Sequence, residues 1–177
     1  MSAKKQHDEW IEVVDKQGTV YDTARREEVH RNPSLLHRAV HILVVNGNGD
    51  IFLQKRSATK DIQPGKWDTS VGGHLNVGES YERAAKREAD EELGIHGLSL
   101  EKLYDYPWRS DRESELVRTF LCRYDGPFSM DVEELETGRF WTLEEIQANL
   151  GTGVFTPNFE EEFSRYLRWQ SEKRTTR

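Results

Sequence analysis

The 177-residue chain lacks the features of membrane-spanning and disulfide-stabilised proteins. No apolar run approaches the roughly 18 residues needed to cross a bilayer, and the first ten residues, MSAKKQHDEW, contain no apolar segment of the kind found in signal peptides. Cys122 is the only cysteine, so no internal disulfide can form. Its neighbours Phe120 and Leu121 favour a packed side chain over a reactive thiol. These absences predict a cytoplasmic protein.

Basic residues are also scarce relative to acidic ones. The chain has 25 Lys and Arg against 32 Asp and Glu, a net charge of −7, and no basic cluster beyond Lys173, Arg174 and Arg177. Such a balance disfavours the phosphate backbone of a nucleic-acid polymer as a partner. The length predicts one domain, residues 1–177, with an N-terminal hairpin at about 10–24 and a core at about 36–177.

Alternating and continuous apolar segments predict strands, and two capping signals predict helices. Thr142 followed by Glu145 is typical of a capping box that opens a helix closed by Gly151, and Pro157 suits the first turn of a last helix ending near Glu172. The predicted strands are 10–14, 19–23, 39–45, 51–56, 69–72, 98–108, 116–124 and 138–141. This order predicts an α+β fold with a mixed β-sheet sandwiched between helices.

An acidic helix is predicted at residues 79–93. Its apolar stripe consists of residues at i, i+4 spacing: Tyr81, Ala85, Ala89 and Leu93. Glu88, Glu91 and Glu92 share a patch beside this stripe, where like charges oppose each other. A solvated charged face is one reading of this helix. A divalent cation would remove the conflict, and an all-oxygen ligand set suits Mg²⁺.

The stretch GHLNVGESYERAAKREADEELGI, residues 73–95, resembles the Nudix box, G-x5-E-x7-R-E-U-x-E-E-x-G-U with U apolar. The resemblance implies a Nudix fold and Mg²⁺- or Mn²⁺-dependent hydrolysis of a nucleoside diphosphate linked to another group, or of a similar diphosphate. It implies metal binding by Glu88 and Glu92, with Glu91 as a further ligand or catalytic base. Glu79 would support the site, Arg87 would orient Glu91, and the backbone at Gly73 would approach the substrate. The acidic residues Glu133, Glu134 and Glu136 are alternative positions for the base.

A second resemblance covers residues 30–94 and is to the branch of the Nudix family that includes type I isopentenyl-diphosphate isomerase. It rests on His37-Arg38-Ala39, Leu53-Gln54-Lys55-Arg56-Ser57, Pro64-Gly65-Lys66-Trp67 and Gly73-His74. The isomerase holds a metal with three His and two Glu, and the matching residues here are His30, His37, His74, Glu113 and Glu115. Mixed imidazole and carboxylate ligands suit Mn²⁺ or Zn²⁺, although a histidine beside an apolar run is also typical of a structural role.

The isomerase carries its catalytic Cys at the position of Gly72, so isomerase activity is predicted to be absent. Isomerisation and non-catalytic diphosphate binding remain the alternatives to hydrolysis. Lys55 and Arg56 could reach the phosphates or lie at a solvated strand end. Three aromatic residues could stack on a base or prenyl group or belong to the core: Trp67, Tyr106 and Trp108. His41 is predicted to be structural, and exposed strand edges make a homodimer possible.

Overall fold

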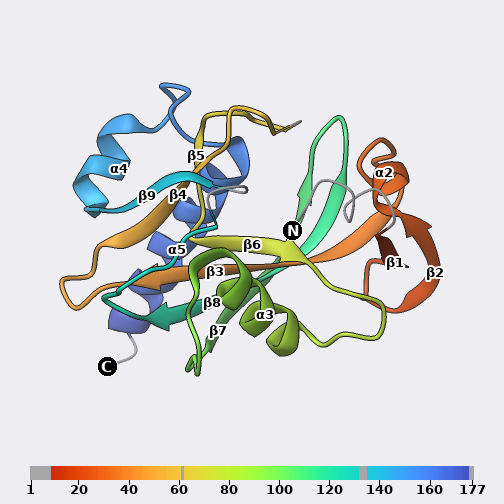
Figure 1. Cartoon of the computed structure of the whole chain (residues 1–177), viewed down its shortest axis with the longest axis horizontal. Coiled ribbons are helices and arrows are strands. Elements are labelled where there is room, and N and C mark those ends of the chain that lie inside the picture. Colours follow the sequence, from red (N-terminus) through yellow and green to blue (C-terminus); the bar gives the residue numbers. More distant parts are fainter. Residues whose placement is uncertain (1–8, 61, 132–134, 176–177) are drawn as a thin grey trace.

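The computed structural model describes residues 9–60, 62–131 and 135–175, and a single mixed sheet occupies their centre (Figure 1). The elements, in chain order, are β1 (Trp10–Val14), β2 (Val20–Arg25), α2 (Arg26–Val29), β3 (Leu36–Val45), β4 (Ile51–Arg56), β5 (Trp67–Asp68), β6 (Val71–His74), α3 (Tyr81–Leu93), β7 (Glu101–Arg109), β8 (Ser114–Arg123), β9 (Leu135–Trp141), α4 (Leu143–Asn149) and α5 (Pro157–Thr175).

Strand β3 is the centre of the sheet. It pairs in parallel with β8 along its whole length and antiparallel with β6, and it also contacts β1 and β4. The path β2-β1-β3-β4-β5 extends the sheet on either side of it, while β7 pairs with β8 and β9 with β4. A strand with neighbours on both edges and layers on both faces needs a continuous apolar sequence, and AVHILVV provides one.

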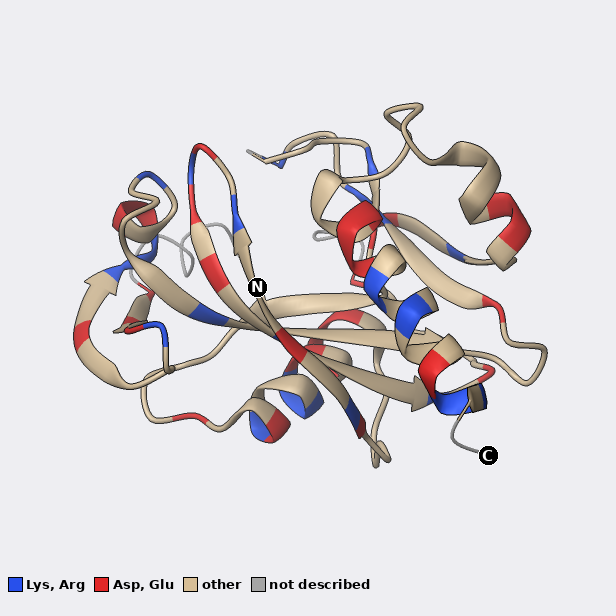
Figure 2. Cartoon of the chain, turned by 180° about the vertical axis from the view of Figure 1, so that it is seen from behind, with Lys and Arg blue, Asp and Glu red and all other residues tan. Residues whose placement is uncertain are grey.

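Alternation along β3 divides the core between two helices. Val40, Ile42 and Val44 pack with the apolar stripe of α3, where Ala85, Ala89 and Leu93 are fully buried. On the opposite face, Leu43 and Val45 pack with three aromatic residues of α5: Phe159, Phe163 and Tyr166. Helix α3 lies in front of the sheet in Figure 1, and α5 lies in front when the molecule is seen from behind in Figure 2. The predicted α+β sandwich is thereby confirmed.

Several element boundaries differ from the predicted ones. Helix α3 begins at Tyr81 because Ser80 caps it, accepting a hydrogen bond from the Arg83 amide, and Glu79 stays outside the helix. Helix α4 ends at Asn149, before Gly151, and α5 extends to Thr175. The capping box between Thr142 and Glu145 is present as predicted.

Strand β6 lies later than the predicted strand 69–72, and this shift positions the site. It pairs His74 with Ala39 and Gly72 with His41. Successive strand residues face opposite sides of a sheet, so Gly73 faces α3 while Gly72 and His74 face the side of α5. Within the described residues, none of the helices combines the length and apolar character needed to cross a membrane.

Candidate functional site

The first part of the site lies where α3 crosses β6. A Cβ atom on Gly73 would come within 2.3 Å of the Glu88 side chain, so the carboxyl group lies directly over this glycine. Glu88 Oε1 accepts a 2.7 Å hydrogen bond from Arg87 Nη1. Burial raises the pKa of Glu88 to about 7, although Arg87 opposes the shift. The carboxyl group can therefore change its protonation state near neutral pH, and a bound cation would favour the ionised form.

Arg87 connects the acidic residues of this region. It donates to Glu79 through Nε and Nη2, at 3.1 and 2.9 Å, and to the backbone carbonyl of His74 at 3.0 Å. Its Nη1 lies 3.4 Å from Glu91, which is longer than its bond to Glu88. Arg87 thus contacts Glu91 as the box implies, but it holds Glu79 and Glu88 more closely. Although burial opposes the shift, hydrogen bonds from Arg87 and the Asn76 amide lower the pKa of Glu79.

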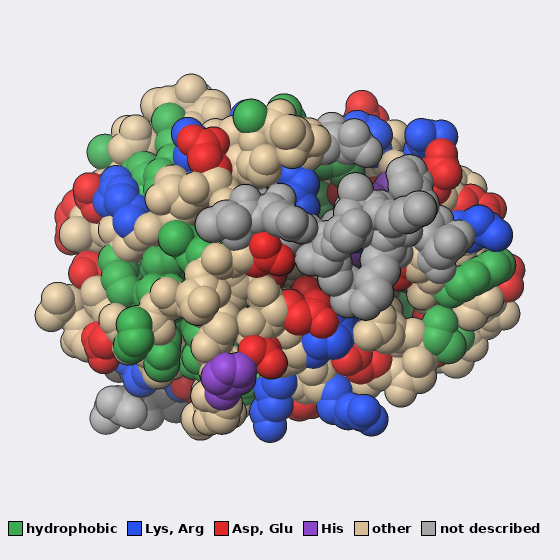
Figure 3. Space-filling model, viewed as in Figure 1, with side chains coloured by type: hydrophobic (Ala, Val, Ile, Leu, Met, Phe, Trp, Pro, Cys, Tyr) green, Lys and Arg blue, Asp and Glu red, His purple; other side chains and the backbone are tan. Residues whose placement is uncertain are grey.

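Glu91 and Glu92 lie on α3 beside Glu88, and we call these three residues and Glu79 the acidic group. The Glu91 side chain is 38% exposed, whereas Glu92 accepts a 3.1 Å hydrogen bond from Gln54 Nε2 on β4. The motif Leu53-Gln54-Lys55-Arg56-Ser57 does not by itself predict this contact; a polar Gln54 at the end of the apolar, buried part of β4 is the sequence signal that points to it. Figure 3 shows acidic side chains gathered near the centre of the face on which α3 lies.

The second part of the site is a cluster of three histidines and two glutamates on the other side of β6, which we call the His/Glu cluster. Its members come from separate elements: His30 follows α2, His37 lies on β3, His74 on β6, Glu113 in the turn before β8, and Glu115 on β8. Sheet register makes His37 and Glu115 direct neighbours. The structure therefore brings together all five residues that the second resemblance implied.

Distances within the His/Glu cluster are short. The Nε2 atoms of His30 and His74 are 3.2 Å apart. Glu115 Oε1 lies 3.6 Å from His37 Nε2 and 3.5 Å from His74 Nε2, and Glu113 Oε2 lies 3.5 Å from His30 Nε2. Ligand atoms of the three histidines all lie within 4.8 Å of one another, as do those of His37 with both glutamates. This is a spacing at which several side chains can bind one ion.

The electrostatics of the cluster favour neutral imidazoles at His30 and His74 beside an ionised Glu115. Burial and the neighbouring His74 lower the pKa of His30 to about 2, and burial also lowers the pKa of His74. Burial and Glu115 raise the pKa of Glu113 to about 7. Burial opposes ionisation of Glu115, but the adjacent His37 and His74 rings hold its pKa well below the usual value. Both ring nitrogens of His37 are buried without a hydrogen-bond partner, a costly arrangement that a bound cation would relieve.

The predicted phosphate-binding residues already have protein partners. Lys55 pairs with Glu136 at 2.7 Å, and Arg56 pairs with Asp68 at 3.1 Å while donating to the Ile62 carbonyl. Of the alternative base positions, Glu136 is engaged in this way, and Glu133 and Glu134 lie outside the described residues.

The three aromatic residues considered for stacking are buried to different degrees, and only Tyr106 is a core residue. Tyr106 is 1% exposed and its hydroxyl donates to Asn158, so the stacking role considered for Tyr106 is wrong. Trp108 packs partly buried beside it. Trp67 is half-buried against Trp141 and keeps part of its ring at the surface.

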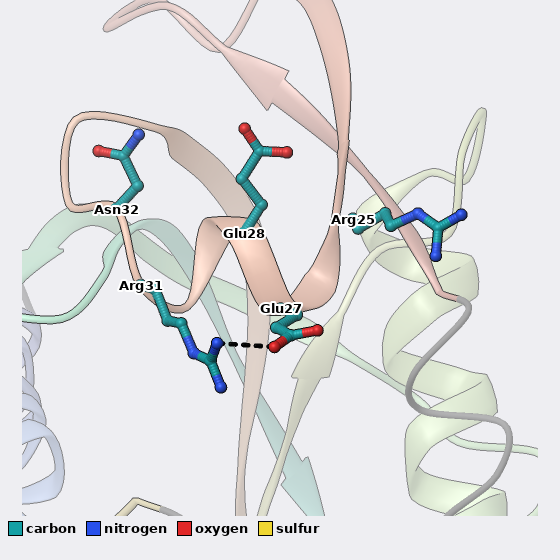
Figure 4. Close-up of a pocket in the computed structure, with 5 residues that line it drawn as sticks. All are labelled: Arg25, Glu27, Glu28, Arg31 and Asn32. Atoms are coloured by element: carbon teal, nitrogen blue, oxygen red, sulfur yellow. Dashed lines mark ion pairs between the residues drawn. The ribbon is translucent and has the colours of Figure 1, made fainter.

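A hollow of about 330 Å³ lies on the outside of α2 (Figure 4). Its lining is Arg25, Glu27, Glu28, Arg31 and Asn32, and Arg31 pairs with Glu27 at 2.7 Å. Both side chains are largely exposed, so this hollow offers solvated charges rather than an enclosed site. Lys and Arg are interspersed with Asp and Glu across the face seen in Figure 2.

Comparisons with known proteins identify the family of the chain. Residues 35–170 match the model of the NUDIX domain. An uncharacterized Nudix hydrolase of Yersinia pestis is 34% identical over 93% of this chain and 89% of its own. Isopentenyl-diphosphate Delta-isomerase 2 of Photorhabdus laumondii is 31% identical over 86% of this chain and 89% of its own. The crystal structure of DR0079 from Deinococcus radiodurans has a TM-score of 0.78 at 25% identity, covering 89% of this chain and 98% of that one. With the box over α3 and most of the chain inside the matched range, the protein belongs to the Nudix hydrolase family.

Proposed function

We propose that the protein hydrolyses a phosphoanhydride bond in a nucleoside diphosphate linked to another group, or in a similar small diphosphate, with Mg²⁺ or Mn²⁺. The observation that carries this proposal is the Glu88 carboxyl group, partly buried over Gly73 and held by Arg87. Arg87 carries a single positive charge, whereas three glutamates lie beside it: Glu79, Glu88 and Glu91. A divalent cation would balance the remaining negative charge.

Each residue of the acidic group has a proposed task. Glu88 and Glu92 would hold the cation, and Glu91 would complete the ligand set or accept a proton from the attacking water. The cation, when bound, supplies activation of water and neutralises charge on the non-bridging oxygens. Arg87 keeps Glu79 and Glu88 in place through short hydrogen bonds. Glycine at position 73 lets the backbone lie directly under Glu88, because a side chain there would displace the carboxyl group.

A second cation is proposed for the His/Glu cluster, with Mn²⁺ or Zn²⁺ as the ions that suit its ligand types. The fit rests on the orphaned ring nitrogens of His37 and on the neutral state that burial favours for His30 and His74. Neutral imidazole is the form that ligates metal.

The test is a screen of nucleoside, sugar, coenzyme and isoprenoid diphosphates with Mg²⁺ or Mn²⁺, scored for phosphate and monophosphate products. Glu88→Gln and Glu92→Gln are expected to lower turnover by orders of magnitude. The control Glu27→Gln removes an exposed acid that pairs only with Arg31 in the described structure and should retain activity. A non-catalytic binding module would instead keep ligand affinity in Glu92→Gln and show no turnover in the wild type. Absence of turnover on the whole panel would overturn the proposal.

Isomerisation is the second candidate, favoured by the likeness to the Photorhabdus isomerase and by the His/Glu cluster. It requires an acid and a base on opposite sides of an alkene, and Gly72 has no side chain to supply one. Incubation with isopentenyl diphosphate, followed by NMR of the double bond, separates the two reactions. Migration at an enzymatic rate would favour isomerase over hydrolase.

A further inference from the structure

A buried polar pair lies on the α5 side of the sheet, outside the acidic group and the His/Glu cluster. His41 Nδ1 lies 3.0 Å from Glu162 Oε2. Glu162 is completely buried, and its other oxygen accepts a 2.5 Å hydrogen bond from the Thr119 hydroxyl. An ionised carboxylate only accepts hydrogen bonds, so the Nδ1 atom of His41 carries the proton in this contact.

The pair is held from several elements. His41 and Thr119 are direct neighbours on β3 and β8, and Glu162 reaches them from α5. The Tyr104 hydroxyl donates to the Glu162 backbone carbonyl at 3.3 Å. Burial lowers the pKa of His41, but Glu162 outweighs burial and raises it to about 9. The imidazole is therefore a cation at neutral pH, and both of its ring nitrogens are hydrogen-bond donors.

The second ring nitrogen of His41 faces Gly72. The two residues are paired across β3 and β6, and a Cβ on Gly72 would lie 3.2 Å from His41 Cδ2 and 3.5 Å from Nε2. Among the described residues, no hydrogen-bond acceptor for Nε2 is found, and 8% of the side chain still reaches solvent. A donor with a charged ring thus borders Gly72, where a side chain would crowd the imidazole ring and the Thr69 methyl group.

This position lies on the same face as the His/Glu cluster. Along β3, His37 and His41 point to one side, as do Gly72 and His74 along β6. The carboxylates of Glu115 and Asp68 are close enough to act on His41 electrostatically. A ligand oxygen reaching His41 therefore enters mostly acidic surroundings, which favours an oxygen that belongs to a metal-bound phosphate over a free anion.

We propose that His41 is a ligand-binding residue whose Nε2–H donates a hydrogen bond to a phosphate oxygen of the substrate beside Gly72. Glu162 and Thr119 are the positioning residues that fix the ring and its protonation. The inference rests on the proposed function for the phosphate chemistry of the ligand. It assigns to His41 more than the structural role predicted from the sequence, and it gives a reason for glycine at position 72.

The experiment records the ring nitrogens of ¹⁵N-histidine-labelled protein by NMR while magnesium pyrophosphate is added. The Nε2 resonance of His41 should shift saturably. His41→Gln should weaken pyrophosphate binding about tenfold or more, the usual range for a hydrogen bond to a charged group. His96→Gln is the matched control, because His96 is 77% exposed and pairs with Asp90 at the surface; it should bind like the wild type.

Gly72→Ala provides a second variant in case His41→Gln does not fold. Its methyl group would crowd the Nε2 side of the His41 ring without removing the ring or Glu162, so pyrophosphate binding should weaken and the His41 shift should shrink. Pyrophosphate could bind without changing the chemical shifts of His41, and Gly72→Ala could bind it as the wild type does. In that case the His41–Glu162 pair is purely structural and the inference is wrong.

The same data separate this inference from the proposed function. Hydrolysis without any response of the His41 resonances would contradict the inference about His41 alone. A saturable His41 shift with no hydrolysis of any diphosphate would contradict the hydrolase proposal alone. If the protein neither bound nor hydrolysed a diphosphate, both proposals would be wrong.

Discussion

The two faces of β6 differ in the residues that neutralise or hydrogen-bond their carboxylates. On the α3 face, the acids belong to one stretch of chain, and Arg87 within that stretch bonds to Glu79 and Glu88. On the α5 face, the His/Glu cluster is assembled from four separate elements and an intervening turn, and within the described residues its glutamates pair only with histidines. Among the described residues, neither ring nitrogen of His37 makes a hydrogen bond, and Nε2 lies 3.6 Å from Glu115.

This difference indicates different dependence on a cation. The α3 face is held in place by its own arginine, so its geometry should persist without metal. The His/Glu cluster leaves buried polar atoms unsatisfied, and such atoms are costly. Changes at Glu88 and its neighbours on α3 should therefore appear mainly in turnover, and changes within the His/Glu cluster mainly in metal-linked stability.

Substitutions at the adjacent residues Gly73 and Gly72 are the strongest test of the difference between the two faces of β6. Gly73→Ala places a methyl group within 2.3 Å of the Glu88 side chain, which must move. We expect turnover of the best substrate from the diphosphate screen to fall roughly 100- to 1000-fold, since displacing a catalytic group by about 1 Å has effects of this order. Steady-state kinetics measure the loss, and circular dichroism checks that the fold persists.

Gly72→Ala is the matched control for that change. Its methyl group meets the His41 ring at 3.2 Å, which needs only a small adjustment, and it points away from α3. It should change substrate affinity more than kcat. If both variants lost kcat equally, the two faces would not be functionally distinct.

The next largest effect is expected for metal binding by the His/Glu cluster. At a free Zn²⁺ or Mn²⁺ concentration of 100 times Kd, stabilisation should be about 2.7 kcal/mol, which raises Tm by roughly 5–10 °C for a chain of this size. His37→Gln and Glu115→Gln should remove most of the rise, as followed by differential scanning calorimetry. Glu88→Gln, on the other face, should keep it. A rise that survives in both cluster variants would place the ion elsewhere.

The sequence predicted the α3 face better because that face is local. Glycine, acids and arginine at fixed spacing on one loop and helix determine most of their own geometry, so residues 73–95 were sufficient to identify them. Gln54, by contrast, reaches Glu92 from a distant strand, and spacing along the chain carries no information about such a contact.

The residues of the α5 face could not be grouped from their spacing in the sequence, because they meet only in the tertiary structure. The five cluster residues were found only through resemblance, because the register of His37 with Glu115 is a property of the folded sheet. The predicted strand 69–72 stopped short of His74, since a sequence ending in two glycines hides the pairing with Ala39. Glu162 was missed because an acid in an amphipathic helix reads as solvent-facing, whereas here it is completely buried beside His41.

A smaller effect is expected from the His41–Glu162 pair in the pH dependence of folding. The folded-state pKa of His41 is raised to about 9 from the usual 6.5, so its stabilisation is complete below pH 6.5 and is lost as pH rises toward 9. The free energy of unfolding should fall by roughly 2.5 kcal/mol over this interval, as measured by urea titration. His41→Gln should flatten this decline. Comparison of the two proteins cancels the contributions of Glu88 and Glu113, whose raised pKa values of about 7 act in the same direction.

The smallest effects should come from helix caps, and they test whether Arg87 or the cap positions the α3 face. Thr142→Ala removes a full capping box from α4 and should cost about 1 kcal/mol. Ser80→Ala removes a single 3.3 Å hydrogen bond from the start of α3 and should cost less. Because Arg87 holds both Glu79 and Glu88, turnover of Ser80→Ala should stay within about twofold of the wild type. Urea titration measures the loss of stability, and steady-state kinetics measure turnover. A large loss of turnover in Ser80→Ala at nearly unchanged stability would mean that the cap, rather than the arginine, sets the geometry of the acidic group.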